Sequence, residues 1–354
     1  MTKRVLLIVS LALVGCGAGA AAPGAEAGAK GVGTMAAPEG VTVSGSPYRY
    51  ATLFPNTVPK VTVIERIDRD GGRIGRWWYL RGHYYVPAVA YDGSGGGLSA
   101  NGRTLVLSRF TFEYPPRETR LAVLDTDLYL RHPRRPGQER PPHAITRIDL
   151  EGDFSFDAIS PDGSTVYLIH RYLSPHAGAA YLATYEVRAL DTASGRLLPE
   201  PIVDPTEPDE RMEGVPITRA SGPDGRWAYT LYDGNGKEPF LHALDTVRGR
   251  AVCVDLPQLE GRHDLFMSRL RMEADSRRLA VFNRPPNLER SRQLLSVDTK
   301  TFAVREPAPV ATASSGAGTP WLPIAIVAAA IVAAMTWVLA RRQRAAARRP
   351  LEQR

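Results

Sequence analysis

The chain has 354 residues, a formal net charge of +7 and two cysteines, Cys16 and Cys253. Two cysteines exclude a disulfide framework, and the excess positive charge lies at the two ends of the chain, where Lys3, Arg4 and six arginines beyond residue 340 supply it. The portion between the ends is therefore close to neutral. This argues against nucleic acid as a partner, because a protein that binds nucleic acid needs a basic surface to neutralise phosphates.

The N-terminus has the pattern of an export signal, expected over residues 1–24. Lys3 and Arg4 precede a short apolar stretch that is followed by small residues, and that stretch is too short to span a membrane. Two cleavage points remain open. The sequence Leu-Val-Gly-Cys that ends at Cys16 resembles a bacterial lipobox and makes Cys16 a candidate for lipidation, whereas a cut after Ala20 would remove it. A flexible linker rich in glycine and alanine is expected over residues 25–47.

One short motif recurs along the middle of the chain, as a turn followed by an apolar strand. Proline presets φ at the second position of a turn, aspartate bonds to nearby amides and glycine takes the positive φ that closes a hairpin. The turns occupy Ser99 to Gly102, Ser160 to Gly163, Gly222 to Gly225 and, in degenerate form, Glu273 to Ser276. Each copy predicts a tight β-hairpin.

A second motif follows each turn at a regular distance and ends an apolar strand. Its copies are Leu124-Asp125-Thr126, Leu190-Asp191-Thr192, Leu244-Asp245-Thr246 and Val297-Asp298-Thr299, with an earlier relative at Ile67-Asp68-Arg69. Successive aspartates lie 53 to 66 residues apart. The carboxylate can accept amide hydrogens of the turn that follows, which gives the motif a structural role.

Two hairpins in a repeat of this length are typical of a four-stranded blade, and no long 3.6-residue pattern interrupts them. The sequence therefore predicts an all-β fold, a β-propeller of about five four-stranded blades over residues 48–306. The first blade is the doubtful one, since its inner hairpin lacks the Asp-Gly turn, and closure of the ring stays open. Cys253 lies in an alternating strand and is expected to be a small core residue.

The two motifs together resemble the repeats of the TolB-like, PD40 and YVTN (YncE-like) propellers of bacterial envelopes. The resemblance covers roughly residues 48–306 and rests on hairpin turns, so it describes architecture more than function. It implies an extracytoplasmic protein that binds other proteins or small ligands.

The C-terminal region reads as a membrane anchor. A linker over residues 307–320 leads to an uncharged apolar run at residues 321–340, long enough to cross a bilayer, and an arginine-rich tail follows at residues 341–354. The basic tail places the C-terminus in the cytoplasm. We therefore expect a single-pass protein of the cell membrane with its propeller on the extracytoplasmic side.

No catalytic motif accompanies these repeats. The chain lacks a Gly-x-Ser-x-Gly elbow, a His-Glu-x-x-His pair, paired cysteine ligands and a Walker-type Gly-Lys-Ser sequence. His170 and His176 are the nearest histidines and are interpreted as loop residues rather than a metal site, so no cofactor is expected. Two charged insertions are candidate loops for binding, residues 131–143 (basic) and 204–213 (acidic), although most such insertions are solvated connections. The aromatic cluster from Trp77 to Tyr85 is expected to pack between blades.

The sequence thus favours a non-enzymatic propeller, anchored in the membrane, that binds a protein or an envelope polymer through its blade loops. Two alternatives remain. A propeller enzyme of the lactonase or quinoprotein type would bring Asp, Glu, His or Arg side chains together at the central channel, and a structural spacer would have no partner.

Overall fold

A computed structural model describes residues 36–55, 58–113, 115–131, 144–175, 181–209 and 211–307. The export signal, Cys16, the apolar run at 321–340 and the basic tail lie outside these residues, as do nearly all of the 307–320 linker and most of the basic insertion. Within the described residues, no helix has the length and apolar character needed to span a bilayer.

The described chain folds into five antiparallel sheets in sequence order. The first contains β1 (Tyr48–Leu53), β2 (Val61–Asp68) and β3 (Ile74–Arg81). The second contains β4 (Tyr84–Tyr85), β5 (Thr104–Arg109), β6 (Glu118–Asp125) and β7 (Ile145–Glu151). The third contains β8 (Asp153–Ile159), β9 (Thr165–Pro175), β10 (Tyr181–Asp191) and β11 (Arg196–Ile202), with β12 (Met212–Glu213) paired to β10.

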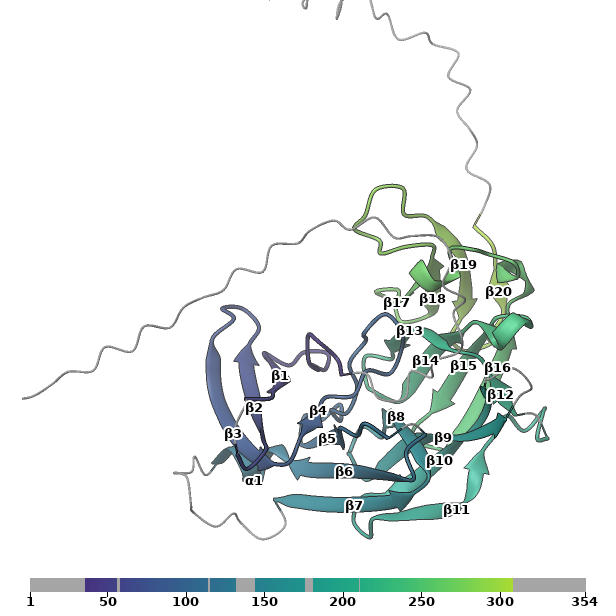
Figure 1. Ribbon diagram of the computed structural model, residues 1–354. Helices are drawn as coiled ribbons and strands as arrows, with labels where there is room; N and C mark the ends of the chain where they lie inside the picture. The colour runs from purple at the N-terminus through teal and green to yellow at the C-terminus, as the bar shows by residue number, and fades with distance from the viewer. Residues whose placement is uncertain are drawn as a thin grey trace, which may run out of the picture. The chain divides into compact units, whose positions relative to one another are not determined.

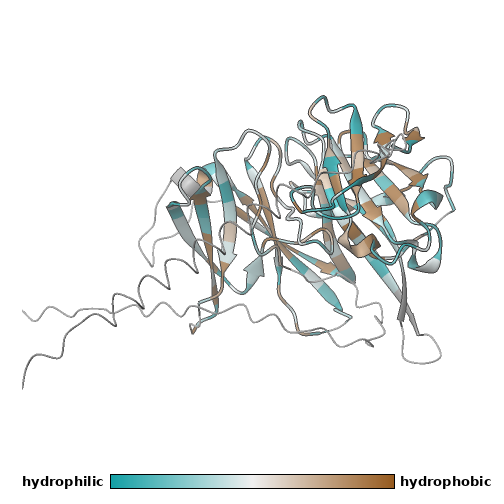
Figure 2. Ribbon diagram, turned by 90° about the horizontal axis from the view of Figure 1, so that it is seen from above, coloured by the Kyte–Doolittle hydropathy of each residue, from teal (hydrophilic) through white to brown (hydrophobic). Residues whose placement is uncertain are grey.

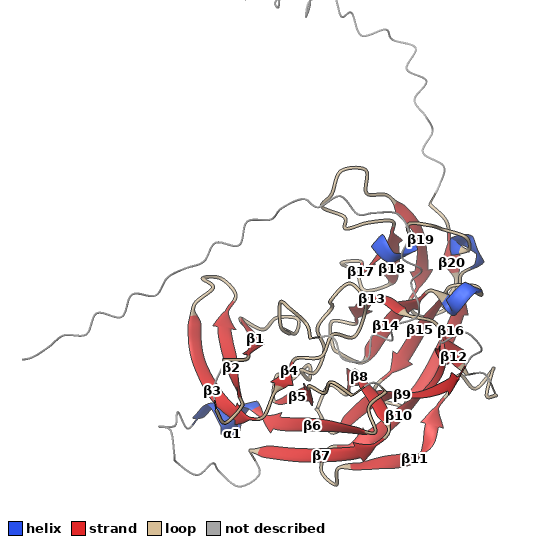
Figure 3. Cartoon of the chain, viewed as in Figure 1, coloured by secondary structure: helices blue, strands red, loops and turns tan. Residues whose placement is uncertain are grey.

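The fourth sheet contains β13 (Pro216–Ser221), β14 (Trp227–Tyr232), β15 (Phe240–Asp245) and β16 (Arg250–Asp255). The fifth contains β17 (Arg269–Met272), β18 (Arg278–Phe282), β19 (Gln293–Asp298) and β20 (Val304–Arg305). The described helices are short: α1 (Thr126–Arg131), η1 (Gly234–Gly236), η2 (Pro257–Leu259) and η3 (Leu265–Met267), and Figure 3 shows how little they add to the strands.

Each sheet is a simple up-and-down meander, and we call the five sheets blades 1 to 5. In Figure 1 the blades follow one another around a common centre, with β4, β8, β13 and β17 on the inside and β7, β11 and β16 on the outside. The predicted all-β fold with four-stranded antiparallel sheets is therefore confirmed, and its layout is that of a β-propeller with five blades.

The hydrophobic core is divided into layers between neighbouring blades. Middle strands are buried on both faces, and alternate residues of one strand serve different layers: Leu105 and Leu107 of β5 pack with blade 1, whereas Val106 packs with blade 3. Figure 2 shows apolar residues along the strands of the sheets. Further layers join blade 3 to blade 4 through Tyr167 and Ala228, and blade 4 to blade 5.

The two sequence motifs interlock in blades 2 to 5. In every case the register places the first residue of the second strand opposite the motif aspartate, for example Trp227 opposite Asp245. The motif threonine then donates a hydrogen bond to a carbonyl of the preceding hairpin turn, at 2.6 to 3.0 Å: Thr126 to Gly102, Thr192 to Gly163, Thr246 to Gly225 and Thr299 to Ser276. The predicted structural role of the motif is confirmed.

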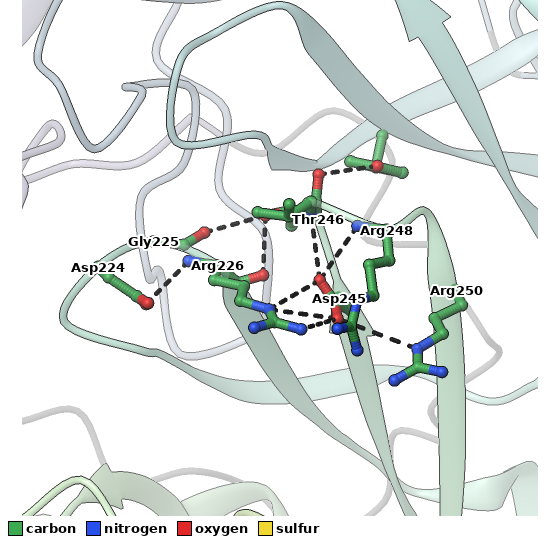
Figure 4. A network of polar contacts seen from close by, with 9 residues as sticks. Asp224, Gly225, Arg226, Asp245, Thr246, Arg248 and Arg250 are labelled. Atoms are coloured by element: carbon green, nitrogen blue, oxygen red, sulfur yellow. Dashed lines mark hydrogen bonds and ion pairs between the residues drawn. The ribbon is translucent and has the colours of Figure 1, made fainter.

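The motif aspartates accept amide hydrogens as expected. Asp245 accepts the amides of Val247 and Arg248 at 3.1 Å, and the guanidinium of Arg226 donates to it at 2.7 Å. Figure 4 shows Arg226 and Arg248 beside the carboxylate. Burial alone would raise the pKa of Asp245, but the hydrogen bonds from Arg226 and these amides lower it below its usual value. The carboxylate therefore stays ionised and holds the turn together.

Blade 1 obtains its innermost position from the chain before β1. The amide of Val41 donates to the carbonyl of Tyr50, and the amide of Tyr50 donates back, both at 2.8 Å. Ala37 and Val41 are buried, although they belong to the segment expected to be a linker. A turn through Gly45, with φ of +73°, replaces the Asp-Gly turn of the other blades, so blade 1 has four positions with the inner one reduced to a single bridge.

Candidate functional site

The propeller has two unlike ends, because connections alternate along a meander. We call the end with the repeated hairpin turns the hairpin-turn face. There the blades touch: the amide of Asn101 donates to the carbonyl of Pro161 at 3.1 Å, linking blades 2 and 3. We call the other end the long-connection face; it carries the connections that follow β1, β3, β5, β11, β14, β16 and β18.

A cavity of about 400 Å³ lies at the centre, lined by the chain before β1 and by the inner strands and turns of blades 2 to 5. Most of its lining is Gly, Ala, Ser, Val and Pro. Its charged residues are Asp157, Arg219 and Glu273. Glu273 is ion-paired with Arg278 at 2.9 Å.

Asp157 of β8 and Arg219 of β13 form a buried ion pair between blades 3 and 4. The guanidinium of Arg219 contacts the Asp157 carboxylate and also donates to the Asp157 carbonyl at 2.7 Å. Only 8% of the arginine side chain and 1% of the aspartate side chain are exposed. The two side chains therefore neutralise each other, and their ion pair links the inner strands of blades 3 and 4.

Three buried polar side chains, those of His242, Tyr232 and Tyr185, lie near this ion pair. Burial lowers the pKa of His242 below its usual 6.5, with Asp157, Arg219 and Asp204 as the charged neighbours, so the imidazole is neutral at pH 7. Burial also raises the pKa of Tyr232 and of Tyr185, which stay protonated. These groups lie within the blade interface, where a substrate has no access, and they extend the polar contact between blades.

No group of three or more potential metal ligands occurs among the described residues. His170 lies on β9, stacked on Phe154 with ring centroids 4.2 Å apart and with Nδ1 4.0 Å from Glu186. His176 lies outside the described residues. Of the charged residues that line the cavity, Asp157 and Arg219 pair with each other and Glu273 pairs with Arg278.

The candidate loops have different outcomes. In the acidic insertion, Asp204 is buried and accepts the amides of Thr206 and Cys253 at 2.8 and 2.7 Å, so it anchors the loop to β16. Residues 132–143 of the basic insertion lie outside the described residues. Cys253 itself is half-buried on β16 and not in the core, so the expected core position was wrong: the strand does not alternate between buried and exposed residues at this point.

Aromatic side chains gather on the long-connection face in pairs. Phe110 and Phe112 lie edge to face at 4.8 Å between centroids, Tyr91 and Phe266 at 5.3 Å, and Phe54 lies beside His83 at 5.5 Å. Phe112 is 93% exposed, and Phe54, Tyr91, Phe110 and Phe266 are 39 to 53% exposed. Sequence reasoning missed these residues because they are scattered over more than 200 positions. Phe54, Phe110 and Phe112 lie just beyond β1 and β5, but Tyr91 and Phe266 lie within longer connections, so the set has no common sequence signal.

The predicted aromatic cluster of blades 1 and 2 divides by strand alternation. Trp78, Tyr84 and Tyr85 are buried and pack as expected, whereas Trp77 and Tyr79 point outward from β3 and lie edge to face at 5.1 Å.

No family model and no curated protein matches the chain. Solved structures that resemble it include TolB from Acinetobacter baumannii, at 16% identity and a TM-score of 0.35, over 73% of this chain and 51% of that one. The β-propeller domain of the Trilobed protease from Pyrococcus furiosus aligns at 9% identity and a TM-score of 0.37, over 77% and 72%. A prolyl endopeptidase aligns at 14% identity and a TM-score of 0.35, over 81% and 39%. The chain thus spans about half of the TolB chain and less than half of the endopeptidase chain.

Proposed function

We propose that this chain is a non-enzymatic binding protein, an extracytoplasmic β-propeller held in the membrane by residues 321–340, which binds a protein or an envelope polymer through its long-connection face. The observation that carries the proposal is the set of exposed aromatic pairs on that face. Exposed apolar surface costs about 25 cal/mol per Å² relative to burial, and aromatic groups are enriched where partners dock. Clustering at one end of a rigid scaffold favours a docking role.

The hydrogen-bonded turns support a structural role for the hairpin-turn face and a binding role for the long-connection face. In blades 2 to 5 the hairpin-turn face is tied together by threonine hydroxyls and motif carboxylates. Hydrogen bonds of this kind contribute about 1 kcal/mol each. The long-connection face is free of this repeated network and can vary its loops without loosening the blades.

The enzyme alternative requires several reactive side chains at the centre. The cavity offers Asp157 and Arg219, already bonded to each other, and Glu273, bonded to Arg278. A spacer, the other alternative, would leave the aromatic pairs without a purpose.

Site-specific photocrosslinking in the native membrane tests the proposal. The full chain carries p-benzoylphenylalanine at position 112 or 266 on the long-connection face, with position 247 on the hairpin-turn face as the matched control, since Val247 is also well exposed. Discrete adducts from positions 112 and 266 but not from 247 are expected. Absence of adducts from both, or equal adducts from all three, would refute the docking role.

Membrane anchoring and orientation need their own test. Alkaline carbonate washing should leave the full chain in the membrane fraction, and protease added outside spheroplasts should cut within residues 48–306 while sparing the arginine-rich tail. Release of the intact chain by carbonate would rule out the anchor.

A further inference from the structure

A basic cleft of about 610 Å³ opens between blades 1 and 2 on the long-connection face. Its cationic residues are Lys60 and Arg81 from blade 1 and Arg109, Arg120 and Arg147 from blade 2, and one carboxylate, Asp149, accompanies them. We call this feature the basic cleft. The five cations are spread over almost 90 positions of the sequence, so no run of basic residues predicts the cleft.

Most of these charges lack a counter-ion. Arg120 is held by Glu118 at 2.7 Å and lies 3.6 Å from Asp149. Among the described residues, Lys60, Arg81, Arg109 and Arg147 form no ion pair, and all four are exposed. Positive charge is therefore concentrated here, although the propeller as a whole is close to neutral.

The backbone beneath the cleft is fixed. Buried Thr62 donates to the carbonyl of Gly82 at 2.8 Å and accepts the amide of Tyr84 at 2.7 Å. The amide of Gly82 also donates to the carbonyl of Lys60 at 2.9 Å. These bonds set the passage from β3 to β4, so that Lys60 and Arg81 are presented from a rigid wall opposite the blade 2 arginines. Preorganised groups lose less freedom on binding.

The walls determine the kind of ligand. Cations face the cleft from two blades. A tetrahedral phosphate has acceptor oxygens in several directions, so one phosphate can bind cations of both walls at once. A planar carboxylate is satisfied by a single guanidinium group and has no need of the second wall. A cleft of this volume also exceeds the size of one phosphate group. Its uncharged lining residues are exposed Pro59, Gly82 and buried Tyr84, so charged groups supply most of the polar chemistry that a ligand meets there.

We propose that the basic cleft binds a polyanion with repeating phosphate groups. The inference rests on the proposed function, because it names the chemistry of an envelope polymer that the long-connection face would hold.

Fluorescence anisotropy with labelled inorganic polyphosphate tests this on the full chain in a non-ionic detergent. The variant Arg81→Glu/Arg109→Glu reverses one charge on each wall. The control Arg196→Glu/Arg277→Glu changes net charge equally at exposed positions on blades 3 and 5. The cleft variant should bind at least about tenfold more weakly, since two attractions become repulsions, while the control stays within about threefold of wild type. Wild-type affinity should fall steeply with salt, and the cleft variant should show a shallower dependence. Circular dichroism confirms that both variants are folded.

Four results would overturn the proposal: no binding of polyphosphate by the wild type, equal loss in both variants, equal displacement by free phosphate at the same phosphate concentration, or tighter binding of poly-L-glutamate. Binding only to vesicles of anionic phospholipid, and not to the soluble polymer, would also overturn it. Failure here leaves the crosslinks from positions 112 and 266 intact, so the cleft and the docking role are judged separately.

Discussion

Removing Arg219 should destabilise the propeller through the ion that it leaves behind. Arg219→Met deletes the cation that faces Asp157, whose side chain is 1% exposed, together with the hydrogen bond to the Asp157 carbonyl. Stranding a buried charge in this way costs about 3–5 kcal/mol. A buried pair adds little beyond its own desolvation, however, and apolar replacement of both partners is often neutral. The double variant Asp157→Leu/Arg219→Met should therefore lie within about 1.5 kcal/mol of the wild type.

Urea unfolding of the full chain in detergent, followed by circular dichroism at pH 7, measures these differences. The single variants Arg219→Met and Asp157→Leu should have clearly lower midpoints, and the double variant should recover most of the loss, which corresponds to a coupling energy of about 2 kcal/mol or more. If Arg219→Met costs less than about 1 kcal/mol, the pair does not hold blades 3 and 4 together. Additive losses in the double variant would equally contradict this account.

Three further predictions concern the scaffold and use the same unfolding assay. Thr246→Val removes a hydroxyl that donates to the carbonyls of Gly225 and Arg226 at 3.0 and 2.8 Å and should cost about 1–3 kcal/mol, whereas Val247→Thr, its exposed neighbour, should change stability by less than about 0.5 kcal/mol. Gly163→Ala should lower the free energy of unfolding by about 1–3 kcal/mol more than Gly102→Ala. Both glycines have positive φ, but a Cβ at Gly163 would collide with the side chain of Thr104, whereas one at Gly102 meets nothing within 4 Å. Equal losses of stability in the two variants would argue against close contact between the blades. Burial depresses the pKa of His242 in the folded state, so the folded chain binds fewer protons than the unfolded chain as pH falls through 6.5. Wild type should therefore be most stable above that pH and lose stability below it, and an unchanged pH profile in His242→Gln would count against this.

The repeated turns made most of the fold predictable. Ser160 to Gly163 and Leu190-Asp191-Thr192 are local patterns, and local patterns set hairpins and strand ends directly. The inner position of blade 1 was missed because Val41 follows a stretch rich in alanine and glycine, and its turn uses Gly45 without an adjacent aspartate. A single bridge leaves almost no periodic signal.

The candidate sites were far less predictable than the fold. Asp157 and Arg219 are 62 residues apart and meet only because neighbouring blades pack face to face. The same holds for Lys60 and Arg147 on the two walls of the basic cleft. Tyr91, by contrast, reaches Phe266 from the long connection between β4 and β5, where its amide also donates to the carbonyl of Pro216 in blade 4. Contacts between blades depend on how distant segments pack together, so a short stretch of sequence cannot predict them. If β3 had been known to be an edge strand, the alternation of side chains along it would have predicted that Trp78 is buried and that Trp77 and Tyr79 are exposed.

The bonding of Val41 to Tyr50 bears on how the amino terminus can be processed. Maturation that ended upstream of Ala36 would leave blade 1 intact. Trimming by a peptidase beyond Val41 would strip the cover from Tyr50, whose amide and carbonyl would lose their partners, and would uncover the apolar layer beneath Ala37. The first blade therefore sets the limit for cleavage at Val41, 17 residues beyond the leader expected over residues 1–24.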